Sequence, residues 1–247
     1  MKRILLSCLI LVLVGPSSAL RSADRVVEVQ KGETIEVFAK RYLKNPRLWK
    51  RVLDSNNLKR ADFRPGLKLK IPDRFAKKPD AVVLGHTPLA RYSRASSESW
   101  GRIEKGMSIF RMDRISTDAK GAVSLVFQNA MRVQIKPSTR VIINFNSAGG
   151  ASDLFLQEGR IRSFTNAPGR RTAFRVHTPT AVASVRGTDF QTDVEKSGRT
   201  TVACHEGVVE VAAQGKTVKL KQGYTTVIEP GSPPAEPEQL LPPPKPL

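Results

Sequence analysis

Apolar and polar residues follow two different periods along this chain, and the period changes near residue 80. A first helix is predicted from apolar residues spaced i, i+3, i+4 and i+7, namely Ile35, Phe38, Ala39 and Tyr42. A second helix is predicted after Asn45-Pro46, with Trp49, Val52 and Leu53 on its apolar face. Short strands at 25–29 and 67–71 flank the two helices. Residues 24–74 are therefore predicted to form a small βααβ domain.

From residue 81 onward the period is two. Short β-type runs at 123–127, 131–135, 141–145 and 154–156 are separated by Gly, Asn, Ser or Pro at intervals typical of all-β proteins. Gly106, Gly159 and Gly207 each enter a strand after a polar residue, as if each turned a corner. The fold class is therefore predicted as α+β overall, with a solenoid-like or sandwich all-β domain at 81–228. Residues 75–80 are predicted as a linker, and 229–247 as a disordered proline-rich tail.

The first nineteen residues are predicted to be a secretory signal peptide. Lys2 and Arg3 precede an apolar run from residue 4 to 14, Gly15-Pro16 ends the run, and small residues follow up to Ala19. Cleavage after Ala19 would leave a soluble periplasmic protein without a stable membrane span. The alternative is an uncleaved anchor, because the apolar stretch approaches the shortest length that spans a bilayer.

The charge is strongly basic, with 41 Lys and Arg against 22 Asp and Glu, a net charge of +19. Such a charge ordinarily suggests nucleic acid, but the export signal argues against that partner. The excess is spread over both predicted domains, which suits attraction to anionic envelope polymers or lipid head groups. A basic surface without any specific partner is the alternative.

Four motifs carry a resemblance to a known family: VQKGETI, FAKRY, WKRVLDSN and RPGLKLKIP. Together they make residues 26–72 resemble the LysM domain, which binds glycans containing N-acetylglucosamine, chiefly peptidoglycan in bacteria. The resemblance implies a shallow groove between two loops, formed by Gly32, Glu33, Thr34 and Ile35 on one side and Asn56, Asn57 and Leu58 on the other. Glu33 and Phe38 depart from the usual Asp and Ile.

Several of these groove residues also have a purely structural interpretation. Gly32 and Thr34 are the turn and cap residues that the fold alone would require. Asn56 at a helix end could simply bond a free carbonyl.

A second resemblance rests on FRVHTPTAVASVRGTDF, residues 174–190, which is similar to the signature of the FecR domain. In the founding family this domain is the periplasmic part of a transmembrane regulator that signals to a sigma factor. Only Met1 to Arg3 precede the apolar run here, so we expect no sigma-binding segment and no anti-sigma activity. The resemblance implies an all-β domain that makes contacts with other envelope proteins.

No catalytic or metal site is predicted, and no cofactor is expected. Cys204-His205-Glu206 invites a metal or nucleophile interpretation, but strand alternation places Cys204 and His205 on opposite faces, which favours a buried apolar Cys204. We therefore expect a non-enzymatic envelope protein that binds peptidoglycan through residues 24–74 and presents the FecR-type domain for scaffolding or sensing. One alternative is a signalling component that acts with a separate transmembrane regulator. Another is a cell-wall hydrolase, for which the sequence supplies no acid/base or metal set.

Overall fold

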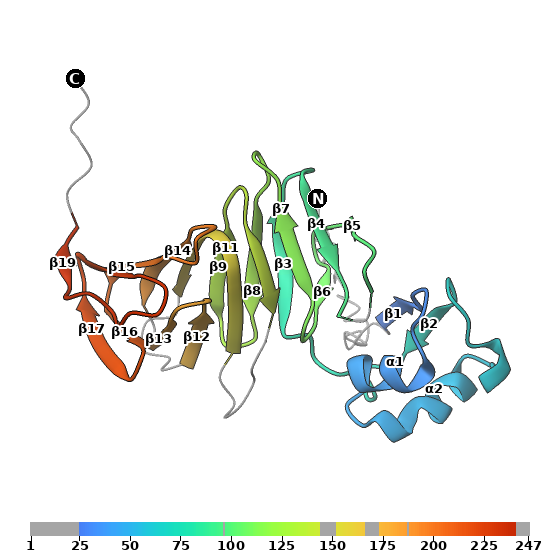
Figure 1. Cartoon of the computed structure of the whole chain (residues 1–247). Helices are drawn as coiled ribbons and strands as arrows, with labels where there is room; N and C mark the ends of the chain where they lie inside the picture. The colour runs from blue at the N-terminus through green and yellow to red at the C-terminus, as the bar shows by residue number, and fades with distance from the viewer. Residues whose placement is uncertain (1–24, 96, 144–151, 166–172, 187, 241–247) are drawn as a thin grey trace, which may run out of the picture.

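The computed structural model describes residues 25–95, 97–143, 152–165, 173–186 and 188–240 (Figure 1). The predicted signal peptide, residues 1–19, lies outside these ranges. The chain is mostly β-sheet, with two short α-helices near its N-terminal end. We call residues 25–80 the N-terminal unit and residues 81–240 the β domain. The elements of the N-terminal unit are, in order, β1 (Arg25–Glu28), α1 (Ile35–Tyr42), the 3-10 turn η1 (Pro46–Leu48), α2 (Trp49–Ser55), the 3-10 turn η2 (Arg60–Asp62) and β2 (Lys68–Ile71).

The helices begin where capping residues satisfy the free amides of a first turn. The Thr34 hydroxyl accepts a hydrogen bond from the main-chain N–H of Val37 at 3.3 Å, which starts α1. Asn45 accepts from the N–H of Arg47 at 3.0 Å and Pro46 follows, so the chain turns into η1 before α2. Neither α-helix in the described ranges has the length and apolarity needed to cross a membrane.

The core of the N-terminal unit lies between its helices and the antiparallel pair β1–β2. Phe38, Leu69 and Ile71 are among its fully buried side chains. The segment predicted as a linker packs back onto this unit, because Ala76 pairs with Leu43 and is itself buried. The N–H of Lys77 also donates to the carbonyl of Tyr42 at 2.7 Å. Residues 75–80 therefore connect the two parts of the chain along a hydrogen-bonded path.

The β domain consists of two sheets that share strand β11. The strands of the first sheet are, in spatial order, β6 (Ser108–Ile109), β3 (Ala81–His86), β8 (Val123–Phe127), β9 (Met131–Ile135), β11 (Ser152–Thr165), β14 (Asp189–Val194), β15 (Thr200–Glu206), β18 (Tyr224–Ile228) and β19 (Glu238–Gln239). Those of the second are β5 (Gly101–Arg102), β4 (Ala90–Ser93), β7 (Arg114–Thr117), β10 (Arg140–Ile143), β11, β12 (Ala173–His177), β13 (Val182–Arg186), β16 (Val208–Ala213) and β17 (Lys216–Lys221).

One hydrophobic core lies between the two sheets. Alternate residues of most strands are buried, as in β8 and β9, so each sheet turns one face inward. Leu125 of the first sheet and Ile115 of the second belong to the same buried cluster. All pairings in the described ranges are antiparallel except that of β11 with β12. The sandwich-like form of the predicted all-β domain is therefore the one observed.

Strand β11 passes from one sheet to the other. Its first residues pair with β10 and β12 of the second sheet, and its last residues pair with β9 and β14 of the first. The passage occurs at Gly159, which has a φ of +94°. A side chain there would lie 2.5 Å from the main-chain oxygen of Ser138, so only glycine allows this close approach.

The prediction of a disordered tail is wrong for residues 229–240. The N–H of Ala235 donates to Val227 at 3.0 Å, and the N–H of Leu240 donates to Gly223 at 2.7 Å. Between them, β19 pairs with β18 at the edge of the first sheet. Prolines are tolerated on an edge strand because their missing donors can face away from the neighbouring strand. Residues 241–247 of the predicted tail lie outside the described ranges.

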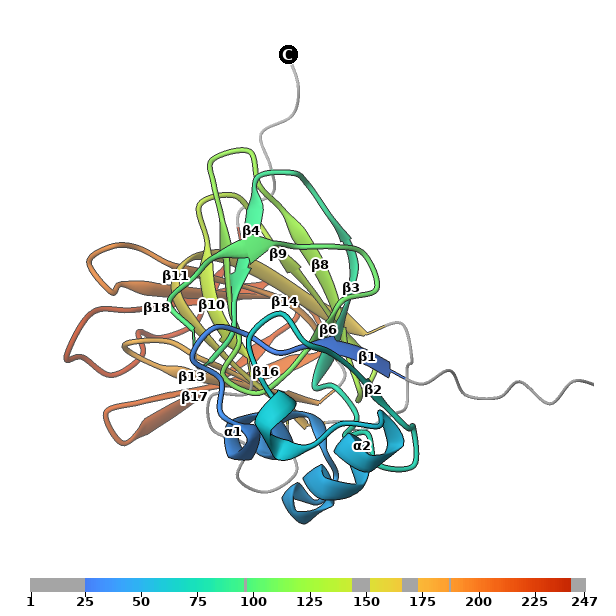
Figure 2. The same cartoon turned by 90° about the vertical axis from the view of Figure 1, so that its right-hand side faces the viewer.

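The N-terminal unit lies at one end of the β domain. Figure 1 shows β1 and β2 beside β6 at this end, while β17 and β19 lie at the opposite end. Figure 2 looks from the side of the N-terminal unit and shows β1 in front of β6. The surface of α1 and β1 that is not covered by β2 and α2 therefore faces the β domain.

Candidate functional site

The seven residues predicted to contact a glycan differ strongly in exposure. Gly32, Thr34 and Asn57 are exposed, Asn56 and Leu58 are partly covered, and Glu33 and Ile35 are buried. Gly32 has a φ of +78° and Asn57 a φ of +56°, so both sit in turns that favour these residue types. Whether these residues contact a glycan stays a prediction.

Asn56 has a structural task within the N-terminal unit. Its amide oxygen accepts from the N–H of Lys70 at 2.9 Å, and its amide nitrogen donates to the carbonyls of Lys70 and Val52. The side chain thus pairs with β2 as a neighbouring strand would. These bonds use most of the hydrogen-bonding capacity of the amide, so Asn57 has the freer side chain of the two.

The two predicted glycan-binding loops are held near each other by the residues that follow them. Arg60, in η2, donates to the carboxylate of Glu36, in the first turn of α1, at 2.6 Å. The rings of Phe63 and Phe38 meet edge to face beneath them, at 5.6 Å between centroids. The loop after β1 and the loop after α2 therefore border the same end of the unit.

A second candidate site lies between the N-terminal unit and the β domain. Phe110, from the loop between β6 and β7, is buried in the core cluster of the N-terminal unit. Its ring meets Tyr42 edge to face, with centroids 5.0 Å apart. The two parts of the chain thus share one aromatic contact in a common core.

An ion pair crosses the same boundary. Arg41 of α1 pairs with Asp113 of the β domain, and both side chains are almost fully buried. The Asp113 carboxylate also accepts from the N–H groups of Phe110 at 2.9 Å and Ala95 at 3.3 Å. Burial of both charges is tolerable because each faces an opposite charge and the carboxylate has further donors.

Two more arginines flank the shared aromatic pair. Arg94 of the β domain donates to the main-chain oxygen of Glu28 in β1 at 3.1 Å, and its guanidinium lies 5.7 Å from the Tyr42 ring centre. Arg25 donates to the main-chain oxygen of Lys77 at 2.6 Å and lies 5.7 Å from the Phe110 ring centre. These cation–π contacts and hydrogen bonds fix both guanidinium groups at the boundary.

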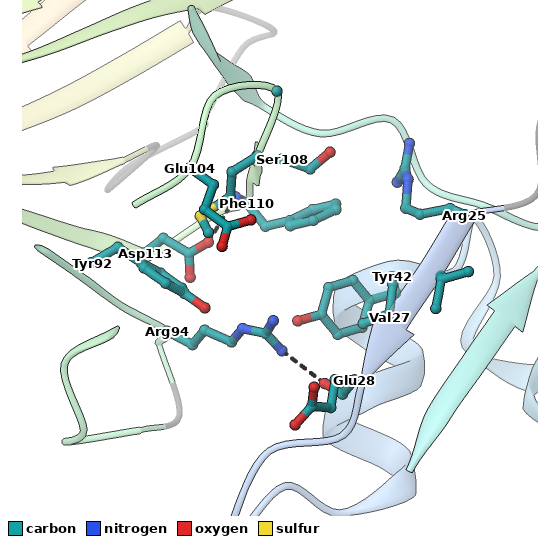
Figure 3. A pocket seen from close by; sticks show the side chains of 13 residues that line it. Arg25, Val27, Glu28, Tyr42, Tyr92, Arg94, Glu104, Ser108, Phe110 and Asp113 are labelled. Atoms are coloured by element: carbon teal, nitrogen blue, oxygen red, sulfur yellow. Dashed lines mark hydrogen bonds between the residues drawn. The ribbon is translucent and has the colours of Figure 1, made fainter. Parts of the chain in front are cut away.

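Between these groups lies a cavity of about 400 Å³. Figure 3 shows Tyr42, Glu28 and Arg25 on the side of the N-terminal unit, and Tyr92, Arg94, Glu104 and Phe110 on the side of the β domain. The volume is in the range of small-ligand sites, and domain boundaries are frequent places for them. We name this space the boundary cavity.

Glu33 connects the first predicted loop with the boundary. Its carboxylate accepts from the N–H of Gln30 at 3.1 Å, while its other oxygen is buried without a partner among the described residues. Burial away from water raises the pKa of Glu33, although the Gln30 hydrogen bond and the charges of Arg94 and Arg41 act in the opposite direction. The charges of Arg94 and Arg41 at the boundary therefore act on a carboxylate that belongs to a predicted glycan-binding loop.

The Cys204-His205-Glu206 segment shows the alternation predicted for it. Cys204 is fully buried, whereas His205 and Glu206 are exposed. Burial raises the pKa of the Cys204 thiol, which disfavours the reactive thiolate. Within the described ranges, no three His, Cys, Asp or Glu side chains converge as a metal site would require.

Reasoning from the sequence missed the boundary cavity altogether. Its residues come from β1, α1, β4 and the segment between β5 and β7. Only FAKRY, which contains Tyr42, and Gly106 belong to patterns identified in the sequence, and neither pattern indicates a contact between the two parts. Phe110 and Asp113 could be linked to Tyr42 and Arg41 only once the docking of the two parts was known.

Comparison with known protein families finds a match for part of the β domain. Residues 113–210 match the family described as FecR protein. No curated protein matches the chain. Two crystal structures of a candidate anti-sigma factor from Parabacteroides distasonis ATCC 8503 resemble it with a TM-score of 0.44 and 16% identity, over 51% of this chain and 59% of that chain. The similarity spans about three fifths of that protein, and a TM-score of this size does not establish a shared fold. The family match thus identifies residues 113–210 as a FecR domain.

Proposed function

We propose that the protein is an exported, non-enzymatic component of the cell envelope that binds peptidoglycan through its N-terminal unit. The observation that carries the proposal is the position of the two loops, which border one end of that unit and expose Gly32, Thr34 and Asn57. The LysM resemblance gives the ligand class. The net charge of +19 adds a long-range attraction to the carboxylates of peptidoglycan stem peptides. In this proposal the FecR domain supplies contacts to another envelope protein, for scaffolding or sensing.

A glycine substitution separates glycan recognition from charge attraction. Asn57→Gly removes an exposed amide while keeping a residue that accepts the positive φ at this position. Gln214→Gly is the matched control, because Gln214 is exposed at a φ of +46° in the turn between β16 and β17. Both variants leave the net charge unchanged.

The measurement is sedimentation of the purified protein with insoluble peptidoglycan at roughly 50 and 500 mM salt, a range over which screening changes strongly. We expect binding that persists at the higher salt, falls by about tenfold in Asn57→Gly, as for one lost hydrogen bond in a desolvated contact, and is unchanged in Gln214→Gly. Binding that disappears at high salt, or that is equal in both variants, would reduce the interaction to charge.

A second candidate function is envelope signalling together with a separate transmembrane regulator. The FecR match at residues 113–210 favours it. In this case, deleting the gene should change transcription that depends on a sigma factor controlled by such a regulator. Loss of peptidoglycan binding in Asn57→Gly should then leave that transcription unchanged if the FecR domain acts independently of the wall.

A further inference from the structure

The boundary cavity has a preformed aromatic floor. Tyr42 and Phe110 are both buried and fix each other by their edge-to-face contact. Behind them, Arg41 and Asp113 neutralise each other. The floor therefore offers an apolar surface without net charge, and a ligand would not have to order it.

The walls of the boundary cavity carry two guanidinium groups, those of Arg25 and Arg94, that are held in place and form no salt bridge with any described residue. Arg25 and Arg94 each donate a hydrogen bond to a main-chain oxygen, which holds the guanidinium without cancelling its charge. A guanidinium has five N–H donors, so such a bond leaves a fork that can accept a carboxylate. Figure 3 shows Arg94 extending from the β domain toward Tyr42 along one side of the cavity.

The rim carries two negative groups. The carboxylates of Glu28 and Glu104 line the same cavity, and neither forms a hydrogen bond or ion pair with any described residue. Figure 3 shows Glu104 on the opposite side of the cavity from Arg94, with the ring of Phe110 beside it. Glu104 thus faces the space from the side opposite Arg94, whereas Glu28 lies beside the Arg94 guanidinium, which donates to its main-chain oxygen.

This arrangement disfavours ligands of a single charge. A simple anion would meet the carboxylates of Glu28 and Glu104, and a simple cation would meet Arg25 and Arg94. Repulsion between a ligand and a protein group of the same charge is one means by which a site rejects the wrong ligand. A ligand that carries both charges can satisfy both kinds of group at once.

We propose that the boundary cavity binds a small zwitterion, namely an amino acid or the end of a short peptide, with an apolar side chain. Its carboxylate meets the Arg94 guanidinium, its ammonium group meets the Glu104 carboxylate, and its side chain lies against Tyr42 and Phe110. The site is separate from the predicted glycan-binding loops and does not depend on the proposed glycan function. Since the ligand touches both parts of the chain, it also strengthens their docking.

The test is isothermal titration of the purified protein with alanyl-phenylalanine, its N-acetyl form and its C-terminal amide, alongside free phenylalanine. We expect the zwitterionic dipeptide to bind about tenfold more tightly than either blocked form, as expected for the loss of one charge-assisted hydrogen bond. Free phenylalanine distinguishes recognition of a single amino acid from recognition of a peptide end. Equal binding of all forms, or no binding of any zwitterion at millimolar concentration, would overturn the proposal.

Two variants separate recognition from folding. Arg94→Gln should weaken binding of the zwitterion about tenfold, whereas Arg132→Gln, at an exposed arginine of β9 outside the cavity, should not. Glu104 has no partner among the described residues to lose, and Glu104→Gln should weaken the preference for a free ammonium group, so that the N-acetyl peptide binds more tightly to this variant than to the unchanged protein. A Glu104→Gln protein with unaltered selectivity would contradict the assignment. Binding of peptidoglycan in the Asn57 experiment is unaffected by either result.

Discussion

Glu33 is a carboxylate held almost out of water, with 6% of its surface exposed, in a loop predicted to bind glycan. Burial raises its pKa above the ordinary value of 4.5. The folded protein therefore binds a proton at this position more readily than the unfolded chain does. The resulting contribution to stability is complete below the unfolded pKa and is lost as the pH rises through the folded pKa.

Replacing Glu33 with Gln should remove this pH dependence. We expect the free energy of unfolding of Glu33→Gln, relative to the unchanged protein, to increase between about pH 4 and pH 7, a range that begins near the ordinary carboxyl pKa. Denaturant unfolding at several pH values measures it. A relative decrease over that range would mean that Arg41 and Arg94 outweigh desolvation.

Glu36 provides the contrasting control one turn away. Its pKa is lowered, first by a hydrogen bond from its own main-chain N–H and also by Arg60. A lowered pKa contributes stability that is present above the unfolded pKa and lost as the pH falls. Glu36→Gln should therefore lose stability relative to the unchanged protein as the pH rises to the ordinary carboxyl pKa of 4.5, and the difference should stay constant above it, where that of Glu33→Gln changes.

At the scale of single residues, the sequence predicted which residues cap a helix or are buried, but not which groups the polar side chains contact. The cap at Thr34 and the buried Cys204 are confirmed. The structural interpretation of Asn56 is confirmed, because its amide donates to the carbonyl of Val52 near the end of α2, and whether Glu33 and Asn56 also contact a glycan stays a prediction. The bond of Asn56 to Lys70 and the influence of Arg94 on Glu33 could not be predicted, because they depend on how distant segments pack.

At the scale of elements, β11 shows where the alternation of buried residues shifts its phase. Leu154 and Leu156 are buried before Gly159, and Ile161 and Ser163 are buried after it. The even-numbered residues face the core in one sheet and the odd-numbered ones in the other. A strand can change sheets in this way only if the chain absorbs the irregularity locally: the register with β10 skips one residue between Leu156 and Glu158, and Gly159 follows at a positive φ.

Gly159→Ala should therefore destabilise the β domain far more than an ordinary glycine substitution. The added carbon would overlap main-chain atoms of Ser138 and Thr139, so we expect a loss of roughly 3–5 kcal/mol. Gly215→Ala is the matched control, with a φ of +74° and open space around it, for which about 1–2 kcal/mol is expected. Equal losses in urea unfolding would show that the backbone at Gly159 can relax.

The strands with regular alternation were predictable, and the strand that shifts was predicted only in two pieces. The predicted runs 123–127 and 131–135 coincide with β8 and β9. The sequence predicted residues 154–156 and a strand entered at Gly159, but not that they form the single strand β11, because buried Asp153 breaks the apolar pattern and Gly159 reverses it. Asp153 is tolerated there because Arg175 donates two hydrogen bonds to it from the next strand in space.

At the scale of the whole molecule, the two parts of the chain are predicted to unfold together. Asp113→Ala leaves Arg41 buried without its partner, which typically costs about 3–5 kcal/mol. Trp49 reports on the N-terminal unit and Trp100 on the β domain, and they are the two tryptophans of the chain. Variants that keep only one tryptophan therefore follow each part separately by fluorescence.

With Asp113 intact, we expect both tryptophans to report the same midpoint of denaturation. With Asp113→Ala, the Trp49 midpoint should move to lower denaturant than that of Trp100. Asp118→Ala serves as the control, because its ion pair with Arg91 is half-exposed and contributes at most about 1 kcal/mol. Separate midpoints in the protein with intact Asp113 would show that the boundary does not couple the two parts.

The position of Phe110 has a consequence for how such a chain can evolve. A βααβ unit that folded alone could be exchanged between proteins as a cassette, with any boundary in the connecting segment. Here, moving the unit to another protein would separate Tyr42 from Phe110 and Arg41 from Asp113. A new partner domain would have to supply an aromatic and an acidic residue at the same places. The two parts are therefore inherited as a matched pair, and substitutions at these four positions should change together.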